Sequence, residues 1–196
     1  MAYDQKFFEA YAQYLAEPTV RENHGWVFRI FDGRCNAKQA AVVDLGCGLG
    51  EYFRHGAFRE YVGVDRHDPG HPGRVISGDY ADPAFLRSQL PFPPQAFVSL
   101  FSIEACLPVV ERYRIYGELF RNFPELTCGL VGGFYYESRR DQETVDEAGN
   151  IVSYQTIDRL GEHPLAGIEE SRLEMHTPSL MFGPDVVEVW KIFRRI

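Results

Sequence analysis

The sequence has no long apolar run and few cysteines. No stretch approaches the ~20 consecutive apolar residues that a helix needs to span a bilayer. Residues 1–10 mix aromatic and charged side chains, so they lack the continuous apolar core of a signal peptide. The cysteines are scattered and form no C-x-x-C pair: Cys35, Cys47, Cys106 and Cys128. Such spacing is typical of reduced thiols, and we expect a cytoplasmic protein with no membrane partner.

Positive charge is also scarce. The chain carries a formal net charge of −8, and its only adjacent basic pairs are Arg139-Arg140 and Arg194-Arg195. Binding to DNA or RNA needs a clustered positive surface. We therefore expect no nucleic acid among the partners.

The composition is that of a globular protein. Hydrophobic residues make up 45% and charged residues 24% of the 196 residues. The chain shows no repeat, low-complexity tract or linker, and its length lies in the range of one domain. We expect a single domain over residues 1–196.

The most specific segment is Ala41 to Tyr52, which reads AVVDLGCGLGEY. Its apolar start predicts a buried strand, and the residues from Glu51 to Arg59 predict a helix. Between them, glycines at alternate positions allow a sharp turn and a close approach of the backbone to a ligand. A strand, a glycine turn and a helix form the first half of a nucleotide-binding βαβ unit. The alternative is an ordinary tight turn in an α/β protein.

The glycine spacing is G-x-G-x-G, which differs from the G-x-G-x-x-G of dinucleotide-binding proteins. An acid also stands two residues before the first glycine. The segment resembles the first motif of the class I S-adenosylmethionine-dependent methyltransferases, roughly V-x-D-x-G-x-G-x-G. The matching residues are Val42, Asp44, Gly46, Gly48 and Gly50. This resemblance implies S-adenosylmethionine as the cofactor.

Two further short strands each end in an acid. Residues 61–65 end in Asp65, and the resemblance implies that this carboxylate binds both ribose hydroxyls. Residues 75–79 end in Asp79, whose family counterpart meets the adenine amino group, while the next residue, Tyr80, packs along the ring. Either acid alone could instead cap a following turn or helix, but the set of three favours a cofactor site.

A fourth predicted strand, residues 96–102, leads into Glu104, where the resemblance places the floor between cofactor and acceptor. Methyl transfer needs a general base only when the acceptor loses a proton in or near the transition state. Glu104 is the candidate catalytic base, and the alternative is an acid at a helix N-terminus or on the surface. Many relatives carry a Glu-His pair here, whereas this chain has Glu104-Ala105-Cys106, which puts the identity of any base in doubt.

The resemblance thus implies a set of cofactor-binding residues in the glycine turn and at the strand ends: Asp44, Gly46, Cys47, Gly48, Gly50, Asp65, Arg66, Asp79, Tyr80 and Ser102. Within this set Cys47 is expected to be a small spacer and not a nucleophile. Histidines and aspartates also lie close together in residues 65–71. Pro69 and Gly70 predict a solvated loop there, so no metal site is expected.

The expected fold is an α/β three-layer sandwich. Its sheet is mostly parallel and seven-stranded, with the last strand antiparallel, as the resemblance implies. An N-terminal helical cap is expected at residues 1–37 and an inserted β-hairpin at residues 143–156. The pattern of apolar residues predicts helices at 4–16, 19–29, 50–58, 82–89 and 109–122, strands at 41–46, 61–65, 74–77, 96–102 and 127–136, and a closing antiparallel pair at 171–182 and 185–196. The predicted buried side of the helix at 109–122 consists of Val109, Val110, Tyr113, Tyr116, Gly117 and Phe120.

The cap contains Arg21, His24 and Trp26. The resemblance implies that an arginine in such a segment can meet the methionine carboxylate of the cofactor, and the alternative for all three is plain packing. We expect methyl transfer to a small-molecule acceptor that lies between the cap and the hairpin. A degenerate S-adenosylmethionine-fold binding module remains an alternative. A nicotinamide-dependent oxidoreductase is a further alternative, which the glycine spacing disfavours.

Overall fold

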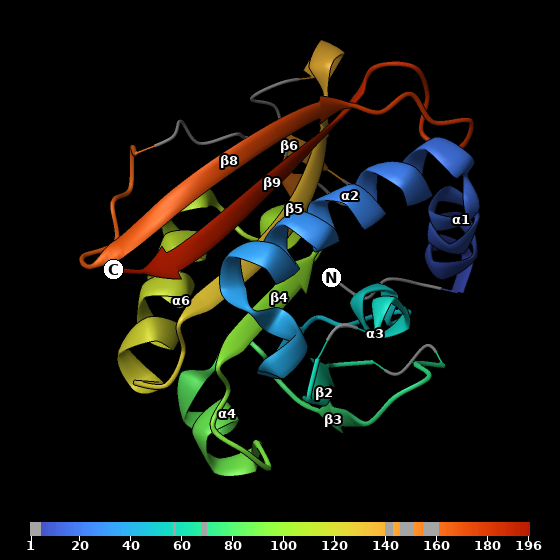
Figure 1. Ribbon diagram of the computed structural model, residues 1–196. Coiled ribbons are helices and arrows are strands. Elements are labelled where there is room, and N and C mark those ends of the chain that lie inside the picture. The colour runs from blue at the N-terminus through green and yellow to red at the C-terminus, as the bar shows by residue number, and fades with distance from the viewer. Residues whose placement is uncertain (1–4, 57, 68–69, 140–142, 146–150, 155–160) are drawn as a thin grey trace.

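A computed structural model describes residues 5–56, 58–67, 70–139, 143–145, 151–154 and 161–196. A seven-stranded sheet with strand order β3-β2-β1-β4-β5-β9-β8 runs through the centre of the molecule (Figure 1). Its strands are β1 Ala41–Leu45, β2 Glu60–Asp65, β3 Val75–Ser77, β4 Ala96–Leu100, β5 Cys128–Tyr136, β8 Ile168–His176 and β9 Val186–Arg195. The strands β1 to β5 pair in parallel, and β9 is antiparallel to both of its neighbours. The expected sheet, mostly parallel with its last strand antiparallel, is confirmed.

Helices cover both faces of the sheet, which makes the three layers. On one face lie α1 Gln5–Ala16, α2 Pro18–Cys35 and α3 Glu51–His55, whose apolar side chains pack on Val42, Val98 and Trp190. On the other face lie α4 Pro83–Gln89 and α6 Val109–Asn122, packed on Val43, Phe97 and Phe193. The short α5, Ile103–Cys106, follows β4. Because both faces are covered, every residue of β1 and β4 is buried.

Several element boundaries differ from the predicted ones for local reasons. Helix α2 starts at Pro18, whose missing N–H costs nothing in the first helical turn, and it continues to Cys35 instead of ending at residue 29. Helix α3 ends at His55 because Gly56 adopts a left-handed conformation with φ 73°. Strand β4 ends at Leu100, two residues early, because Phe101 has φ 56°. The strand predicted over 171–182 is β8, which runs from Ile168 to His176.

The buried face of α6 is also rotated from the predicted one. Val110 was expected to be buried, but its side chain is 65% exposed. Arg112 takes a place on the buried side instead and is 1% exposed, beside Ile115 and Leu119. Two valines at the start of the helix suggested an apolar face there, whereas the packed stripe begins one residue before Tyr113.

The hairpin region follows β5, as expected. Strands β6 Glu143–Val145 and β7 Ile151–Tyr154 pair antiparallel in a small sheet of their own. The expected turn between them, residues 146–150, and residues 155–156 lie outside the described part of the chain. Two 3₁₀ turns, Ala37–Gln39 and Glu137–Arg139, complete the elements. Among the described residues, none of the helices combines the length and apolarity needed to cross a membrane.

Gly129 of β5 can be used to test how closely β5 packs against Phe97 of β4. A Cβ atom on Gly129 of β5 would lie 2.1 Å from Cε1 of Phe97. That ring cannot yield easily, because it is fully buried against Tyr116, Phe120 and Phe193. We expect Gly129→Ala to lower the free energy of unfolding by about 1–3 kcal/mol, measured by urea denaturation.

Gly33→Ala in α2 is the matched control, because a Cβ atom there would have no neighbour within 4 Å. Alanine is the better helix former, so this variant should gain up to about 1 kcal/mol. An unfolding midpoint of Gly129→Ala equal to that of the wild type would contradict the packing at this strand pair.

Candidate functional site

The turn between β1 and α3 consists of residues 46–50, and its three glycines all have positive φ. The values are 69° for Gly46, 45° for Gly48 and 71° for Gly50, a region that side chains disfavour. A Cβ atom on Gly46 would lie 2.1 Å from Oγ of Ser102, so the turn packs directly on the end of β4. A Cβ atom on Gly48 would meet nothing closer than the ring of Phe8 at 3.9 Å, so open space lies beside Gly48. The turn therefore combines a tight inner side with an accessible backbone.

Asp65 lies beside this turn, at the end of β2. Its Oδ2 accepts a hydrogen bond from the backbone N–H of Gly48 at 2.9 Å, and its Oδ1 accepts one from His67 at 3.1 Å. Each carboxylate oxygen retains a further lone pair. The structure thus brings together two residues that the sequence separates by a helix and a strand.

Asp79, Tyr80 and Arg66 meet at the neighbouring strand ends. Oδ2 of Asp79 pairs with the guanidinium of Arg66 at 2.7 Å, and its Oδ1 accepts a hydrogen bond from Ala81 N. The Arg66–Asp79 pair is solvent-exposed, so it contributes little stability and can open at little cost. The hydroxyl of Tyr80 accepts a hydrogen bond from Oγ of Ser102 at 2.6 Å, which links the ends of β3 and β4.

Asp44 lies under the turn and is 1% exposed. Its Oδ2 accepts a hydrogen bond from the Tyr61 hydroxyl at 2.7 Å, and Nε2 of His71 lies 3.0 Å from the same hydroxyl. Among the described residues, Oδ1 of Asp44 has no hydrogen-bond partner. Burial raises the pKa of Asp44 to about 7, against the lowering effect of the Tyr61 hydrogen bond. The group therefore titrates near neutral pH.

Cys47 turns its side chain away from the open side of the turn. It is 7% exposed, and a Cβ atom on Gly63 of β2 would lie 2.5 Å from its sulfur. Its carbonyl accepts the hydrogen bond from Gly50 N at 2.8 Å that closes the turn. Its backbone, and not its thiol, is the part that belongs to the turn.

Glu104, predicted as a general base, lies elsewhere. It is 8% exposed, and its carboxylate accepts hydrogen bonds from Arg112 at 3.0 Å, Tyr116 at 2.6 Å and Lys191 at 3.2 Å. Two cations and a hydroxyl already occupy its lone pairs, so the carboxylate is poorly placed to take a proton from a substrate. This arrangement suits a residue that holds α5, α6 and β9 together, and the catalytic role of Glu104 stays a prediction.

The two cations of that cluster, Arg112 and Lys191, were not predicted from the sequence. Arg112 falls in the apolar stripe of α6, four residues before Tyr116. Lys191 alternates with Val189 and Phe193 on one face of β9. A charged residue in an apolar stripe is a signal for a buried ion pair, but the partner Glu104 could not be identified from spacing.

A second buried network joins the N-terminal helices to the glycine turn. His24 of α2 is 2% exposed; its Nδ1 contacts the carboxylate of Glu51, and its Nε2 lies 2.9 Å from Glu188 of β9. Glu188 also accepts hydrogen bonds from Tyr14 and from Trp190 Nε1. Burial alone would lower the pKa of His24, but the two carboxylates outweigh it and raise that pKa to about 10. His24 is therefore an imidazolium at neutral pH.

Of the three cap residues singled out from the sequence, only His24 belongs to this network. Trp26 is 44% exposed, and Arg21 lies at the edge of a hollow beside α3. Glu51 follows Gly50 directly, so the network reaches the first residue of α3. Sequence alone gave no sign of the His24–Glu51 pair, because its members come from different elements.

No protein-family model matches the sequence, and no curated protein matches it. Solved structures do match the fold. An amino pentose methyltransferase from Micromonospora echinaspora, solved with S-adenosylmethionine bound, gives a TM-score of 0.59 at 15% identity over 100% of this chain and 99% of that one. Magnesium protoporphyrin IX methyltransferase from Synechocystis PCC 6803, also with bound S-adenosylmethionine, gives 0.59 at 14% identity over 98% and 92%. A methyltransferase from Anabaena variabilis ATCC 29413 gives 0.57 at 14% identity over 98% and 96%.

The chain has the class I methyltransferase fold. In open sheets of this kind, ligands bind beyond the carboxyl ends of the parallel strands, where the strand order reverses. Here β1 lies between β2 and β4, and the sheet grows outward from it in both directions. The residues predicted from the glycine motif and the acid-tipped strands lie at that edge of the methyltransferase fold. Glu104 is the predicted site residue that the fold directs into a separate cluster.

The charge on His24 predicts a pH-dependent stability. The folded pKa of about 10 exceeds the unfolded value of about 6.5, so the stabilisation is complete below pH 6.5 and is lost as the pH rises through 10. His24→Gln leaves two carboxylates without their cation and should cost roughly 3–5 kcal/mol near pH 6. Urea denaturation at pH 6 to 10.5 should show this difference shrinking as the pH rises.

His176→Gln is the control, because His176 is exposed. It should change the free energy of unfolding by less than about 0.5 kcal/mol throughout that pH range. A His24→Gln protein whose deficit stays constant from pH 6 to 10.5 would show that His24 is not charged in the folded state.

Proposed function

We propose that the protein binds S-adenosylmethionine at the glycine turn and catalyses transfer of its methyl group to a small-molecule acceptor. The observation that carries the proposal is that residues at the ends of β2 and β4 meet at the glycine turn between β1 and α3. The backbone N–H of Gly48 is held by Asp65, and Gly46 packs on Ser102. The same residue types in the same order form the cofactor site that the sequence motif implies.

The donor set fits this cofactor. Gly48 offers an open space and a backbone that can approach a ligand closely. Asp65 keeps lone pairs for two hydroxyl groups, which matches a ribose. Above pH 7 the ionised Asp44, whose Oδ1 has no partner among the described residues, places a buried negative charge beneath the turn, which suits a ligand with cationic groups. The hydrogen bond between Ser102 and Tyr80 closes the side of the site that lies at the ends of β3 and β4.

When bound, the cofactor supplies a methyl group that its sulfonium has already activated. The tasks left to the chain are to position the acceptor and to exclude water. A buried aromatic cluster beside the turn can exclude water. Phe101 contacts Tyr11 of α1 with ring centroids 5.9 Å apart, and it contacts Phe134 of β5 at 5.7 Å. These rings line the inner side of the α1–α2 cap.

We place the acceptor between this cap and the β6–β7 pair, beyond the end of β5. Strand β7 lies against α5, so the pair belongs to the same end of the sheet as the turn. The net charge of −8 and the scarcity of basic clusters favour a small molecule over a nucleic acid. No general base is assigned.

A binding module without transferase activity is the second candidate. The observation that favours it is the engagement of Glu104 by Arg112 and Lys191, because a carboxylate that is already paired with two cations is a poor general base. Incubation with S-adenosylmethionine and a panel of amine, hydroxyl and thiol acceptors separates the two candidates. Methylated products detected by mass support transfer, and binding without any product supports the module.

Gly48→Ala tests the cofactor site. The added methyl group would occupy the open space beside the backbone, so we expect the affinity for S-adenosylmethionine to fall at least about tenfold, which is 1.4 kcal/mol. Isothermal calorimetry measures the affinity. The positive φ of Gly48 also predicts a loss of about 1–2 kcal/mol in folding stability.

Gly56→Ala is the control that separates the effect of backbone strain from the effect of a methyl group that blocks the cofactor. Gly56 has φ 73° and no neighbour within 4 Å of its Cβ position, and it lies at the far end of α3. The free energy of unfolding of the Gly56→Ala protein should fall by a similar amount, while the affinity of this protein for S-adenosylmethionine stays unchanged. Equal affinities of the two variants would place the cofactor away from Gly48.

Asp44 predicts a pH dependence of cofactor affinity. Its pKa of about 7 reflects burial together with the nearby carboxylates of Glu51 and Asp65. Below pH 7 the group is largely neutral and offers a cationic ligand less attraction. We expect the affinity for S-adenosylmethionine to rise between pH 6 and 8, by at most about tenfold per pH unit.

Asp44→Asn removes the titrating group and should flatten this profile at a reduced affinity. Calorimetry of both proteins at pH 6, 7 and 8 gives the comparison. The same pH slope in the Asp44→Asn protein would assign the titration to another group.

A further inference from the structure

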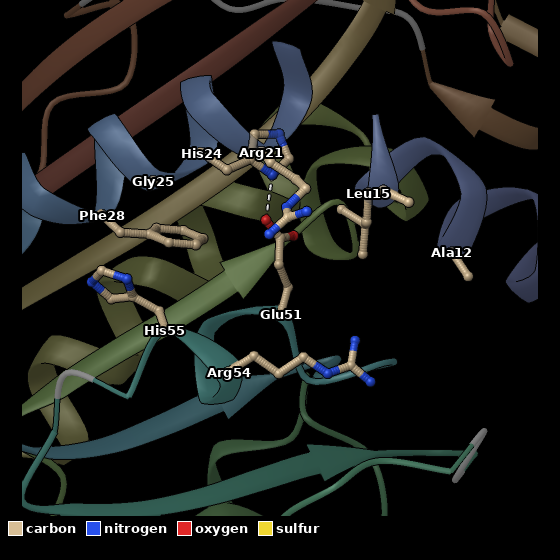
Figure 2. A pocket seen from close by; sticks show the side chains of 10 residues that line it. Ala12, Leu15, Arg21, His24, Gly25, Phe28, Glu51, Arg54 and His55 are labelled. Carbon is tan, nitrogen blue, oxygen red and sulfur yellow. Dashed lines mark hydrogen bonds and ion pairs between the residues drawn. The ribbon is translucent and has the colours of Figure 1, made fainter. Parts of the chain in front are cut away.

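A hollow of about 460 Å³ lies between α1, α2 and α3 (Figure 2). Arg21 and His24 reach it from α2, and Glu51, Arg54 and His55 reach it from α3. None of the glycine-turn and strand-end residues proposed to hold the cofactor lines it, whereas Arg21, for which the resemblance implies a contact with the methionine carboxylate, does. Its volume lies within the roughly 300–1,000 Å³ of small-molecule pockets.

Small residues on facing helices keep the hollow open. Ala12 and Ala16 line it from successive turns of α1, and Gly25 lines it from the middle of α2. A glycine inside a helix costs about 1 kcal/mol relative to alanine. Packing does not demand it here, because a Cβ atom on Gly25 would meet only the end of the Arg29 side chain, at 3.4 Å. The space is therefore retained at a cost to helix stability.

Two arginines on different helices lie at this hollow without a carboxylate partner. Among the described residues, neither Arg21 nor Arg54 takes part in a side-chain hydrogen bond or an ion pair. Among the described residues that line the hollow, Glu51 is the one with a carboxylate, and it is already bonded to the charged His24 and accepts a hydrogen bond from Tyr11. The two guanidiniums therefore keep their donors available.

His55 adds an oriented imidazole to the same wall. Its Nε2 lies 2.7 Å from Oδ2 of Asp32, whose other oxygen accepts a hydrogen bond from Tyr52 at 3.1 Å. This pairing fixes the ring on the lining of the hollow. His55 therefore shapes the wall, and the guanidinium donors are the groups that suit an anion rather than a cation.

We infer that the hollow between α1, α2 and α3 binds a small molecule through a carboxylate or phosphate group, held by Arg21 and Arg54. A ligand in this place contacts α2 and the helix that follows the glycine turn. The inference does not rest on methyl transfer, because none of the residues at the glycine turn and the strand ends lines the hollow. The anionic group can belong to the methyl acceptor or to a separate ligand.

Titration with inorganic phosphate at constant ionic strength tests the site. The side-chain Nε–Hε signals of Arg21 and Arg54 in a ¹H–¹⁵N spectrum should shift and saturate. In a protein carrying Arg21→Gln and Arg54→Gln, the phosphate affinity should fall at least about tenfold. A protein carrying Arg34→Gln and Arg59→Gln loses the same charge at exposed positions outside the hollow and should bind as the wild type does. Shifts without saturation, or an equal loss in both double variants, would overturn the inference.

Two further arms identify the site and the source of the anion. Phosphate binding should persist with saturating S-adenosylhomocysteine and in Asp65→Ala, and competition by S-adenosylhomocysteine would make the hollow part of the cofactor site and overturn the inference. Carboxylated and phosphorylated small molecules are then added with S-adenosylmethionine. A methylated product that the Arg21→Gln, Arg54→Gln protein fails to make identifies the acceptor, whereas binding without product identifies a separate ligand. Failure of every methylation assay with phosphate binding intact would count against the proposed function alone.

Discussion

The structure depends on one turn whose inner side, at Gly46, leaves no room for a side chain. Between β1 and α3 the chain reverses through three glycines with positive φ, and at Gly46 the end of β4 comes so close that a Cβ atom would collide with Ser102. On its other side, the turn donates the Gly48 N–H to Asp65 at the end of β2. One short segment thus fixes the ends of the two strands that flank β1. Any bulkier residue at Gly46 would push these strand ends apart.

Two buried ion clusters hold the outer layers to this centre, one on each face of the sheet. His24 joins the N-terminal helices to Glu51 and Glu188, and Glu104 joins α5 to Arg112 and Lys191. Buried charges are tolerated only when they are paired, so each cluster specifies one arrangement of its helices. Through its contacts with Arg112 and Lys191, Glu104 links α5 to α6 and β9.

Apolar periodicity predicted helices and strands well where the pattern lay within one segment of the chain. The individual strands and the bounds of α6 follow from short apolar runs and from a helical stripe, whereas the seven-stranded sheet with its antiparallel last strand was implied by the methyltransferase resemblance. The exact face of α6 did not follow, because Val110 is apolar yet exposed and Arg112 is charged yet buried. The helix propensity of a single segment cannot show that a charged side chain will form an ion pair with a residue from another element. The early end of β4 had no signal in the sequence either, because a positive φ at a phenylalanine such as Phe101 is not expected from its residue type.

By itself the sequence determined the glycine turn and the acids at the strand ends, because these depend on residue type and spacing within single segments. The tertiary structure alone decided which distant side chains meet. It placed Asp65 on the N–H of Gly48, His24 on Glu51 and Glu104 on Lys191. It also decided that small residues of α1 and α2 face each other across a hollow. These contacts join residues far apart in the chain, and only the packing of whole helices on the sheet brings them within bonding distance.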